Sequence, residues 1–500
     1  MRAFLLPLLF IAVFSARAEI TTGFAERDIS PEIGMERPGG YVKGYHKAFH
    51  DPCKARAAVF SDGTASVALV GLDALFIRKP QVDEARRRVA EATDIPPHAV
   101  MIGASHSHSS GPTGMVLPGE YDHAEQWIQE LAYEGSSMAD PVYLETMVNG
   151  IVEAVVEAWE KRDVTPLGFD RGEEASVSFN RRFKMKNGLT YTHPRYGNPE
   201  MLEPAGPIDP EVGVIGSWNA EGILIGCVVN FACHGTASAP GISANWPWAT
   251  EKIIRGVFGE DVIVVVLNGN SGDVTQVDNN LPFRRIGGEE DALKVGGRIG
   301  AEAVKVLLGL QSDRRSSDYT VGSKAEVLKI ERRAPGSEKL AKARESAQTT
   351  PDDPKRLPGW VWDKETVLLG ALLESKPIQD VEVQAIKVGP AVFISNPAEF
   401  FVDFGLRQKE ESQFTFTWPV SLANGCVGYV PTAAALAEGG GGYETRLTSY
   451  SNLIPTAGDL ICDTGIELAN TMKPDPLPER KAAAAFTAPW TYGNVPPELE

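Results

Sequence analysis

The sequence predicts an α/β (α+β) protein with a large mixed-sheet core, helices packed around that core, and a metal site at the strand ends. Three observations support this prediction. Short apolar runs alternate along the chain with amphipathic helical segments, which is typical of a mixed core. Three pairs of apolar runs are joined by turn signals. Several runs end in histidine, asparagine or glycine, and polar groups and glycine at strand ends are typical of a pocket at a sheet edge.

The first half of the chain begins with two strands around the turn Ser61-Asp-Gly63. The expected elements, in order, are strands over 57–60 and 66–72, a helix over 80–92, a strand over 99–103 and a helix over 141–159. Asp140-Pro141 marks the start of the long helix, because Asp caps a helix and Pro fits its first turn.

The second half of the chain continues the alternation. Strands over 212–218 and 223–231 flank the turn Asn219-Ala-Glu-Gly222, and residues 262–267 read as a buried strand. The remaining expected elements are helices over 292–308, 338–348 (capped by Ser337) and 364–373, a surface loop over 349–354, and a hairpin over 381–395 that turns at 388–390.

The domain organisation predicted from composition has three parts. Residues 1–18 have a basic start, a short apolar run and the small-x-small site Ala16-Arg-Ala18, so they are read as a cleavable signal peptide. Residues 19–471 are read as one catalytic domain, and 472–500 as a Pro/Ala-rich tail. No later apolar run reaches the roughly 18 residues of a spanning helix. We expect a secreted or periplasmic protein without a transmembrane anchor.

Charge and cysteine content narrow the function classes. The formal net charge of −18 argues against a broad face for nucleic acid or an anionic membrane, although it leaves room for a local basic pocket. The five cysteines are too few for a disulfide scaffold. Cys426 with Cys462 is the pair that we expect to form a bridge, if any does.

Three histidines dominate the candidate chemistry. His106 and His108 follow the run 99–103 in Ser-His-Ser-His-Ser-Ser-Gly-Pro, and His234 ends the run 223–231 in Asn-Phe-Ala-Cys-His-Gly. Residues two apart on a strand share a face, so both imidazoles of the pair can ligate, although many such pairs are structural. All eight histidines lie at or before residue 234, so further ligands must be carboxylates, Tyr or Cys.

Three later segments carry candidate site residues. Asn268-Gly-Asn-Ser-Gly-Asp-Val-Thr275 follows a strand, and alone it reads as an ordinary turn with Asp273 in solvent. Glu399 follows the strand ending at 395 and opens a predicted helix, where it is either a cap or a ligand in the mixed N/O set of catalytic zinc. Tyr429 alone reads as a packing aromatic.

The order of these segments resembles the neutral (alkaline, non-lysosomal) ceramidase family over about residues 20–470. Family segments similar to those in this chain are His-Thr-His-Ser-Gly-Pro-Gly, Asn-Arg-Ser, Asn-Phe-x-x-x-His, Gly-(Asn/Asp)-x-Ser-Pro, Pro-Gly-Glu and Tyr-(Ile/Val)-Thr-Thr. Their counterparts here are 106–112, 180–182, 230–234, 272–276, 397–399 and 429–432.

The resemblance implies that His106, His234, Glu399 and Tyr429 bind one Zn²⁺. It also implies that His108 and Arg181 hold and polarise a scissile amide, and that Thr275 stands where the family has a catalytic Ser. Water bound to zinc has a pKa of about 7, so it can attack an amide at neutral pH.

The sequence departs from the family in three places. A Thr replaces the family's Ser at 275, Gln276 replaces the following Pro, and the C-terminal β-sandwich domain of the family is expected to be missing, so only a short tail follows residue 471. The expected function is therefore hydrolysis of a small or lipid-like N-acyl amide, such as an N-acylsphingosine. Two alternatives stay open: a zinc hydrolase for another ester or amide, and an inactive secreted binding protein. Neither the oligomeric state nor the acyl chain follows from the sequence.

Overall fold

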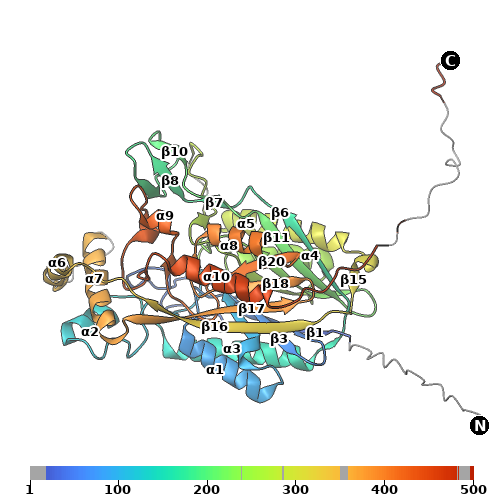
Figure 1. The fold of residues 1–500 in the computed structure, drawn as a ribbon, viewed down its shortest axis with the longest axis horizontal. Helices are drawn as coiled ribbons and strands as arrows, with labels where there is room; N and C mark the ends of the chain where they lie inside the picture. The colour runs from blue at the N-terminus through green and yellow to red at the C-terminus, as the bar shows by residue number, and fades with distance from the viewer. Residues whose placement is uncertain (1–18, 238, 284–286, 350–357, 481, 483–495) are drawn as a thin grey trace, which may run out of the picture.

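A computed structural model describes residues 19–237, 239–283, 287–349, 358–480, 482 and 496–500. The predicted signal peptide, most of the predicted loop over 349–354 and much of the predicted tail lie outside these residues. Within them the structure is mixed α/β with several sheets, so the predicted fold class is confirmed (Figure 1).

The N-terminal strands form a five-stranded sheet in the order β4-β3-β2-β1-β5. Its strands are β1 (Thr21–Asp28), β2 (Lys54–Ser61), β3 (Ser66–Leu72), β4 (Val100–Ala104) and β5 (Asp163–Val164). β3 and β4 are parallel, and the other neighbours are antiparallel. Helices α1 (Lys79–Ala92) and α3 (Pro141–Glu160) pack together beside this sheet at the lower edge of Figure 1. Asp140 caps α3, as its sequence predicts, by accepting hydrogen bonds from the N–H groups of Val142 and Tyr143.

A second five-stranded sheet has the order β13-β12-β11-β6-β15. Its strands are β6 (Leu167–Glu173), β11 (Glu211–Trp218), β12 (Leu224–Phe231), β13 (Ile263–Asn268) and β15 (Arg315–Ser316). The predicted hairpin is present as β11 and β12, and β13 runs parallel to β12. Helices α4 (Trp246–Phe258) and α5 (Glu289–Gly309) pack on each other and on this sheet.

The third sheet has four strands in the order β16-β17-β18-β20. Its strands are β16 (Val321–Glu331), β17 (Ile378–Val388), β18 (Ala391–Ser395) and β20 (Phe416–Val420). The predicted hairpin turn lies at Gly389, whose φ of +57° suits glycine. Helices α8 (Val402–Glu411) and α10 (Ala457–Asn470) cover this sheet.

The first two sheets approach each other closely in the core. A Cβ on Gly71 of β3 would lie 2.4 Å from the carbonyl oxygen of Val266 on β13, so only glycine permits this separation. Buried side chains of all three sheets belong to one apolar cluster, which includes Val70, Val265 and Phe393. The strands that end in the predicted site motifs therefore share one rigid core.

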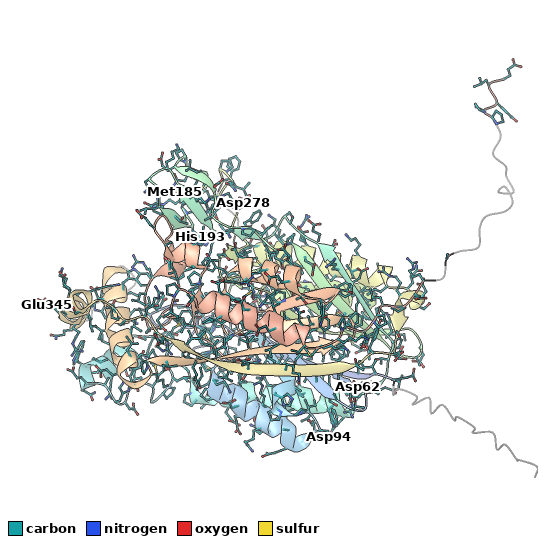
Figure 2. The ribbon with its side chains drawn as sticks, viewed as in Figure 1. Asp62, Asp94, Met185, His193, Asp278 and Glu345 are labelled. Carbon is teal, nitrogen blue, oxygen red and sulfur yellow. The ribbon has the colours of Figure 1, made fainter. Side chains whose placement is uncertain are left out.

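Smaller elements surround this core. β8 (Arg182–Met185), β9 (Thr190–Thr192) and β10 (Met201–Pro204) form a small projecting sheet, close to the labelled Met185 and His193 in Figure 2. The other peripheral elements are α2 (Gln126–Tyr133), α6 (Ser337–Ala347), α7 (Pro358–Ser375) and α9 (Ala433–Leu436), with the two-residue strands β7 (Phe179–Asn180), β14 (Val274–Thr275), β19 (Glu399–Phe400) and β21 (Tyr429–Val430). In the described part of the chain, no helix is both long enough and apolar enough to cross a bilayer.

Two local predictions are wrong. Ser337 is the first residue of α6 rather than its cap, and the capping residue Gly336 has no side chain to accept a hydrogen bond. Cys426 and Cys462 are both free thiols. Their sulfurs contact different groups, the Tyr450 hydroxyl at 3.4 Å and the Phe404 carbonyl oxygen at 3.5 Å.

Candidate metal centre

The first histidine of the site lies just beyond β4. The strand ends at Ala104, and His106 adopts a φ of +60°, which is rare for a residue with a side chain. Its Nδ1 lies 2.9 Å from the carbonyl oxygen of Leu75. A carbonyl oxygen only accepts hydrogen bonds, so Nδ1 carries the hydrogen and Nε2 presents its lone pair to the interior.

The second histidine is placed by the end of β12. His234 Nδ1 lies 3.3 Å from the carbonyl oxygen of Ser271, which again leaves Nε2 with a free lone pair. The following residue, Gly235, passes so close to His106 that a Cβ would lie 2.2 Å from the His106 carbonyl oxygen. Glycine at 235 therefore lets the two histidine segments meet.

Glu399 and Tyr429 reach the same place from a two-residue parallel ladder. β19 pairs with β21, and Glu399 and Tyr429 are register partners in it. The structure corrects the prediction that Glu399 opens a helix, because α8 begins only at Val402. Glu399 Oε2 lies 3.1 Å from His106 Nε2 and 3.7 Å from His234 Nε2.

These donor atoms fit a metal ion. The Nε2 atoms of His106 and His234 are 3.1 Å apart, and two lone pairs at that distance repel each other unless something positive lies between them. Glu399 Oε2 is buried and receives no hydrogen bond of normal geometry. Burial alone would raise the pKa of Glu399, but its interactions with His106, Tyr429 and Arg181 hold the pKa below its ordinary value. Two neutral imidazoles and a carboxylate are typical zinc ligands.

His108 is the third imidazole of this cluster. Its Nε2 lies 3.3 Å from His106 Nε2, and the ligating atoms of His106, His108 and His234 all lie within 4.8 Å of one another. Burial, with the charges of His106, Arg181 and Arg37 added, lowers the pKa of His108 well below its usual value. His108 also lines a surface cavity, whereas His106 and His234 are buried. Its position suits a group that meets both the metal and a substrate.

Arg181 brings a buried positive charge to Tyr429. It follows β7, and its Nη2 donates to the Tyr429 hydroxyl at 3.0 Å and to the Gly272 carbonyl at 2.7 Å. Burial, followed by the charge of Glu399, raises the pKa of Tyr429 well above its ordinary value, while Arg181 opposes the rise. The phenol is therefore neutral even with the Arg181 guanidinium beside it.

Comparison with known proteins shows which fold holds this site. The sequence matches no protein-family model and no curated protein. The structure is similar to that of neutral ceramidase from Pseudomonas aeruginosa, with a TM-score of 0.66 and 18% identity over 93% of this chain and 77% of the other. A structure described as ceramidase complexed with C2 gives a TM-score of 0.65 and 17% identity over 92% of this chain and 77% of that one.

The chain has the fold of neutral ceramidase. The resemblance predicted from the order of the motifs is thus confirmed for the fold. The structure brings six of the seven predicted site residues into one cluster within the ceramidase fold: His106, His108, Arg181, His234, Glu399 and Tyr429.

The hydrogen bond of the Thr275 side chain is made outside that cluster. Thr275 is buried in β14, and its hydroxyl accepts a hydrogen bond from the Val277 N–H at 3.2 Å. Its catalytic role stays a prediction. The nearby Asp273 is not in solvent, as a simple turn would place it. It is fully buried and accepts hydrogen bonds from Asn180 and from the Val402 N–H at the start of α8, and burial raises its pKa to about 6.

Two further residues of the site carry no sequence signal. Glu444 is fully buried and accepts a hydrogen bond from Arg181 Nε at 2.6 Å. Tyr450 donates from its hydroxyl to Glu399 Oε1 at 2.8 Å. Both lie after the Gly439–Gly442 run in a segment without regular spacing. Only the folded chain shows that they support Arg181 and Glu399.

Proposed function

We propose that this protein is an exported zinc-dependent hydrolase that cleaves the amide of an N-acyl substrate, as ceramidase does. One observation carries the proposal: two buried imidazole lone pairs and a Glu399 oxygen without a hydrogen bond are directed toward the same position. Tyr429, the register partner of Glu399, supplies a fourth donor. The order of motifs and the shared fold with neutral ceramidase support the amide as the bond cleaved.

The residues around the metal position divide the work of hydrolysis. Zinc, when bound there, supplies a Lewis acid for the carbonyl oxygen and lowers the pKa of water to about 7. Arg181, held by Glu444, presents fixed positive charge to the oxyanion that develops as water adds to the carbonyl. His108 is neutral, so it accepts the proton that the water loses. It then donates that proton to the amine nitrogen as the C–N bond breaks, leaving a carboxylic acid and an amine.

Metal content tests the proposal directly. We expect the purified protein to contain about one zinc per chain by elemental analysis, since the described residues hold one such donor set. His234→Ala removes a ligand, so we expect it to lose the zinc and at least about 10³-fold of any amidase activity. His98→Ala is the matched control, because His98 is exposed and lines the hollow between α1 and β16 rather than the histidine cluster. Unchanged zinc content in His234→Ala would disprove the metal site.

The substrate class requires a second measurement. We expect release of free amine from N-acyl amides, and comparison of N-acylsphingosine with short N-acyl amides and esters separates a ceramidase from another zinc hydrolase. A protein that holds zinc but cleaves none of them would support the binding-protein alternative. The export prediction is tested separately, by whether the mature chain isolated from its source begins at Glu19.

A further inference from the structure

A small cavity opens onto His108 from the protein surface. It encloses about 310 Å³, near the lower end of the range for ligand pockets. Its wall is made by one loop, which supplies Arg37, Pro38, Gly39, Gly40, Val42 and Gly44, and by His108 and Thr236 from the other side. Pro38 and Val42 are the only apolar side chains among these residues, so the wall offers little contact to a long alkyl chain.

The loop over 37–44 is held firmly against the site. The Arg37 N–H donates to the Gly44 carbonyl at 2.7 Å, which closes the loop. Lys364, fully buried in α7, donates to the Tyr41 carbonyl at 2.9 Å. A Cβ on Gly39, where φ is +95°, would lie 2.2 Å from His108 Nδ1. The backbone that carries Arg37 is therefore fixed relative to the His108 ring.

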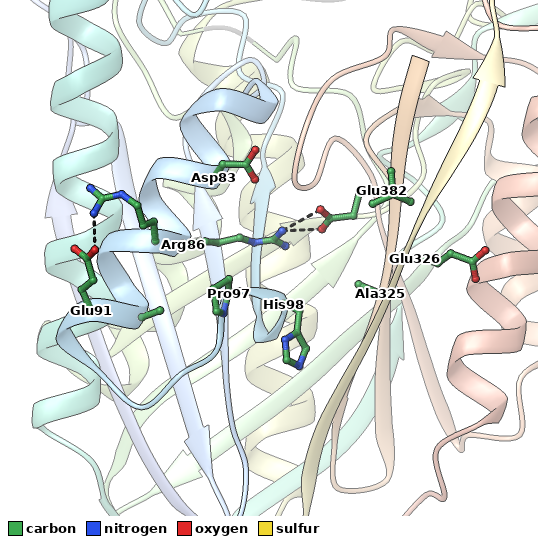
Figure 3. A pocket seen from close by; sticks show the side chains of 11 residues that line it. Asp83, Arg86, Glu91, Pro97, His98, Ala325, Glu326 and Glu382 are labelled. Carbon is green, nitrogen blue, oxygen red and sulfur yellow. Dashed lines mark hydrogen bonds and ion pairs between the residues drawn. The ribbon is translucent and has the colours of Figure 1, made fainter. Parts of the chain in front are cut away.

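The side chain of Arg37 is exposed, lines the cavity, and has no hydrogen bond or ion pair with any residue that the structure describes. Two other buried arginines, Arg181 and Arg86, are already neutralised by carboxylates. Arg181 pairs with Glu444 at 2.6 Å. In the larger hollow between α1 and β16, of about 540 Å³, Arg86 pairs with Glu382 at 2.8 Å (Figure 3). Arg37 is thus a guanidinium on the wall of the catalytic cavity with its charge still available to an anion.

We infer that Arg37 binds a carboxylate on the amine half of the substrate, so that the protein cleaves short N-acyl amino acids in preference to neutral amides. The inference rests on the proposed function. The carboxylate belongs to the amine half because Arg37 shares its cavity with His108, the residue that donates a proton to the leaving amine. A guanidinium matches a carboxylate with two parallel hydrogen bonds, which a hydroxyl of a neutral lipid cannot replace.

A pair of substrates of equal length tests this inference. N-Hexanoylglycine carries the carboxylate, and N-hexanoylethanolamine is its neutral counterpart. We expect kcat/KM of the unmodified protein to favour the glycine amide at least about tenfold. We expect Arg37→Gln to lower that preference about 10- to 100-fold, because a hydrogen bond to a charged group contributes about 1.5–3 kcal/mol.

Lys43→Gln is the matched control. Lys43 lies in the same loop and carries the same charge, but it faces Glu134 at 3.7 Å and does not line the cavity. We expect the substrate preference of Lys43→Gln to equal that of the unmodified protein. An equal loss of preference in both variants would overturn the inference, because the effect of Arg37 would then be that of any positive charge in the loop.

Calorimetric binding of the same two compounds separates the inference from the proposed function. If neither amide is cleaved but N-hexanoylglycine binds at least tenfold more tightly than its neutral counterpart, and Arg37→Gln abolishes that difference, Arg37 recognition stands and the amidase proposal fails. If both amides are cleaved or bound equally well by the unmodified protein and by Arg37→Gln, the inference fails while the amidase proposal stands.

Discussion

At the scale of single residues, the candidate ligands depend on side chains that do not themselves reach the metal position. Glu399 uses one oxygen toward the histidines and the other toward Tyr450. Arg181, which donates to Tyr429, is neutralised in the interior by Glu444. Such supporting hydrogen bonds orient ligands and tune their basicity, so their removal affects the metal without removing a ligand.

Tyr450→Phe removes the hydroxyl that donates to Glu399 Oε1 and leaves the ring in place. We expect zinc affinity to fall about 10- to 100-fold, because the carboxylate loses the contact that orients it. Competition with a chromogenic chelator measures this change. Tyr191→Phe, on the exposed strand β9, is the control and should bind zinc as the unmodified protein does. Equal affinity in Tyr450→Phe would show that the ladder alone orients Glu399.

Glu444→Gln leaves the guanidinium of Arg181 buried without its carboxylate. Breaking one side of a buried ion pair costs about 3–5 kcal/mol, and we expect the free energy of unfolding in urea to fall by that amount. Glu203→Gln breaks a solvent-exposed pair with Lys184 and serves as the control, with no change expected. A drop no larger than that of the control would mean that water reaches Arg181.

At the scale of elements, the close approach of β3 and β13 sets the distance between two sheets. Gly71→Ala places a methyl 2.4 Å from a backbone oxygen that cannot rotate away. We expect a loss of at least about 2 kcal/mol of stability from this overpacking. Gly256→Ala in α4 meets no atom within 4 Å and should stabilise the helix by about 0.5–1 kcal/mol. Thermal unfolding of both variants measures the contrast, and equal effects would contradict the packing argument.

The elements that the sequence predicts well are those with their own periodicity or turn. The β11–β12 and β17–β18 hairpins follow from apolar runs around Asn219–Gly222 and Gly389, and α3 follows from Asp140-Pro141. The ladder of β19 and β21 could not be predicted, because two residues show no period and their pairing spans 30 positions. The His106 and His234 motifs carry a signal because each directly follows a strand, whereas Glu444 and Tyr450 lie in irregular chain.

At the scale of the whole molecule, buried charges tie the layers together. Glu251 of α4, which packs on the second sheet, pairs with Arg56 and Lys54 of β2 in the first sheet. Burial would raise the pKa of Glu251, but Arg56 and Lys54 lower it to about 2. The helix layer on one sheet is therefore linked electrostatically to the other sheet.

This linkage predicts how stability depends on pH. A carboxyl group whose pKa is lower in the folded chain stabilises it above pH 4.5, and that contribution is lost as the pH falls toward 2. We expect this loss to be on the order of 2 kcal/mol between pH 7 and pH 3 in the unmodified protein and absent from Glu251→Gln, as measured by urea unfolding at both pH values. Asp73, whose pKa is raised to about 6 chiefly by burial, has the opposite dependence and is present in both proteins. If the unmodified protein and Glu251→Gln lost the same stability between pH 7 and pH 3, the assignment of this pH dependence to Glu251 would be wrong.

The sequence predicts the fold class of the molecule but not the arrangement of its strands. Alternating strands and helices indicate a mixed core, yet the order of strands in each sheet depends on contacts such as that of Gly71 with Val266, which no local pattern encodes. The motif order resembled a family whose fold the structure shares, although identity is only 18%. Spatial convergence of distant segments is what the sequence alone could not supply.

The two-residue ladder of β19 and β21 has a consequence for how this chain can vary over evolution. Because Glu399 and Tyr429 face each other across a single rung, a shift of one position turns one of them to the opposite side. Insertions or deletions beside Glu399 or Tyr429 should therefore be selected against, and so should those in the glycine run at 439–442, whose carbonyl groups accept hydrogen bonds from Thr190 and Arg182. Relatives that keep the chemistry should show constant spacing around Glu399 and Tyr429 and more variable spacing in segments away from the site.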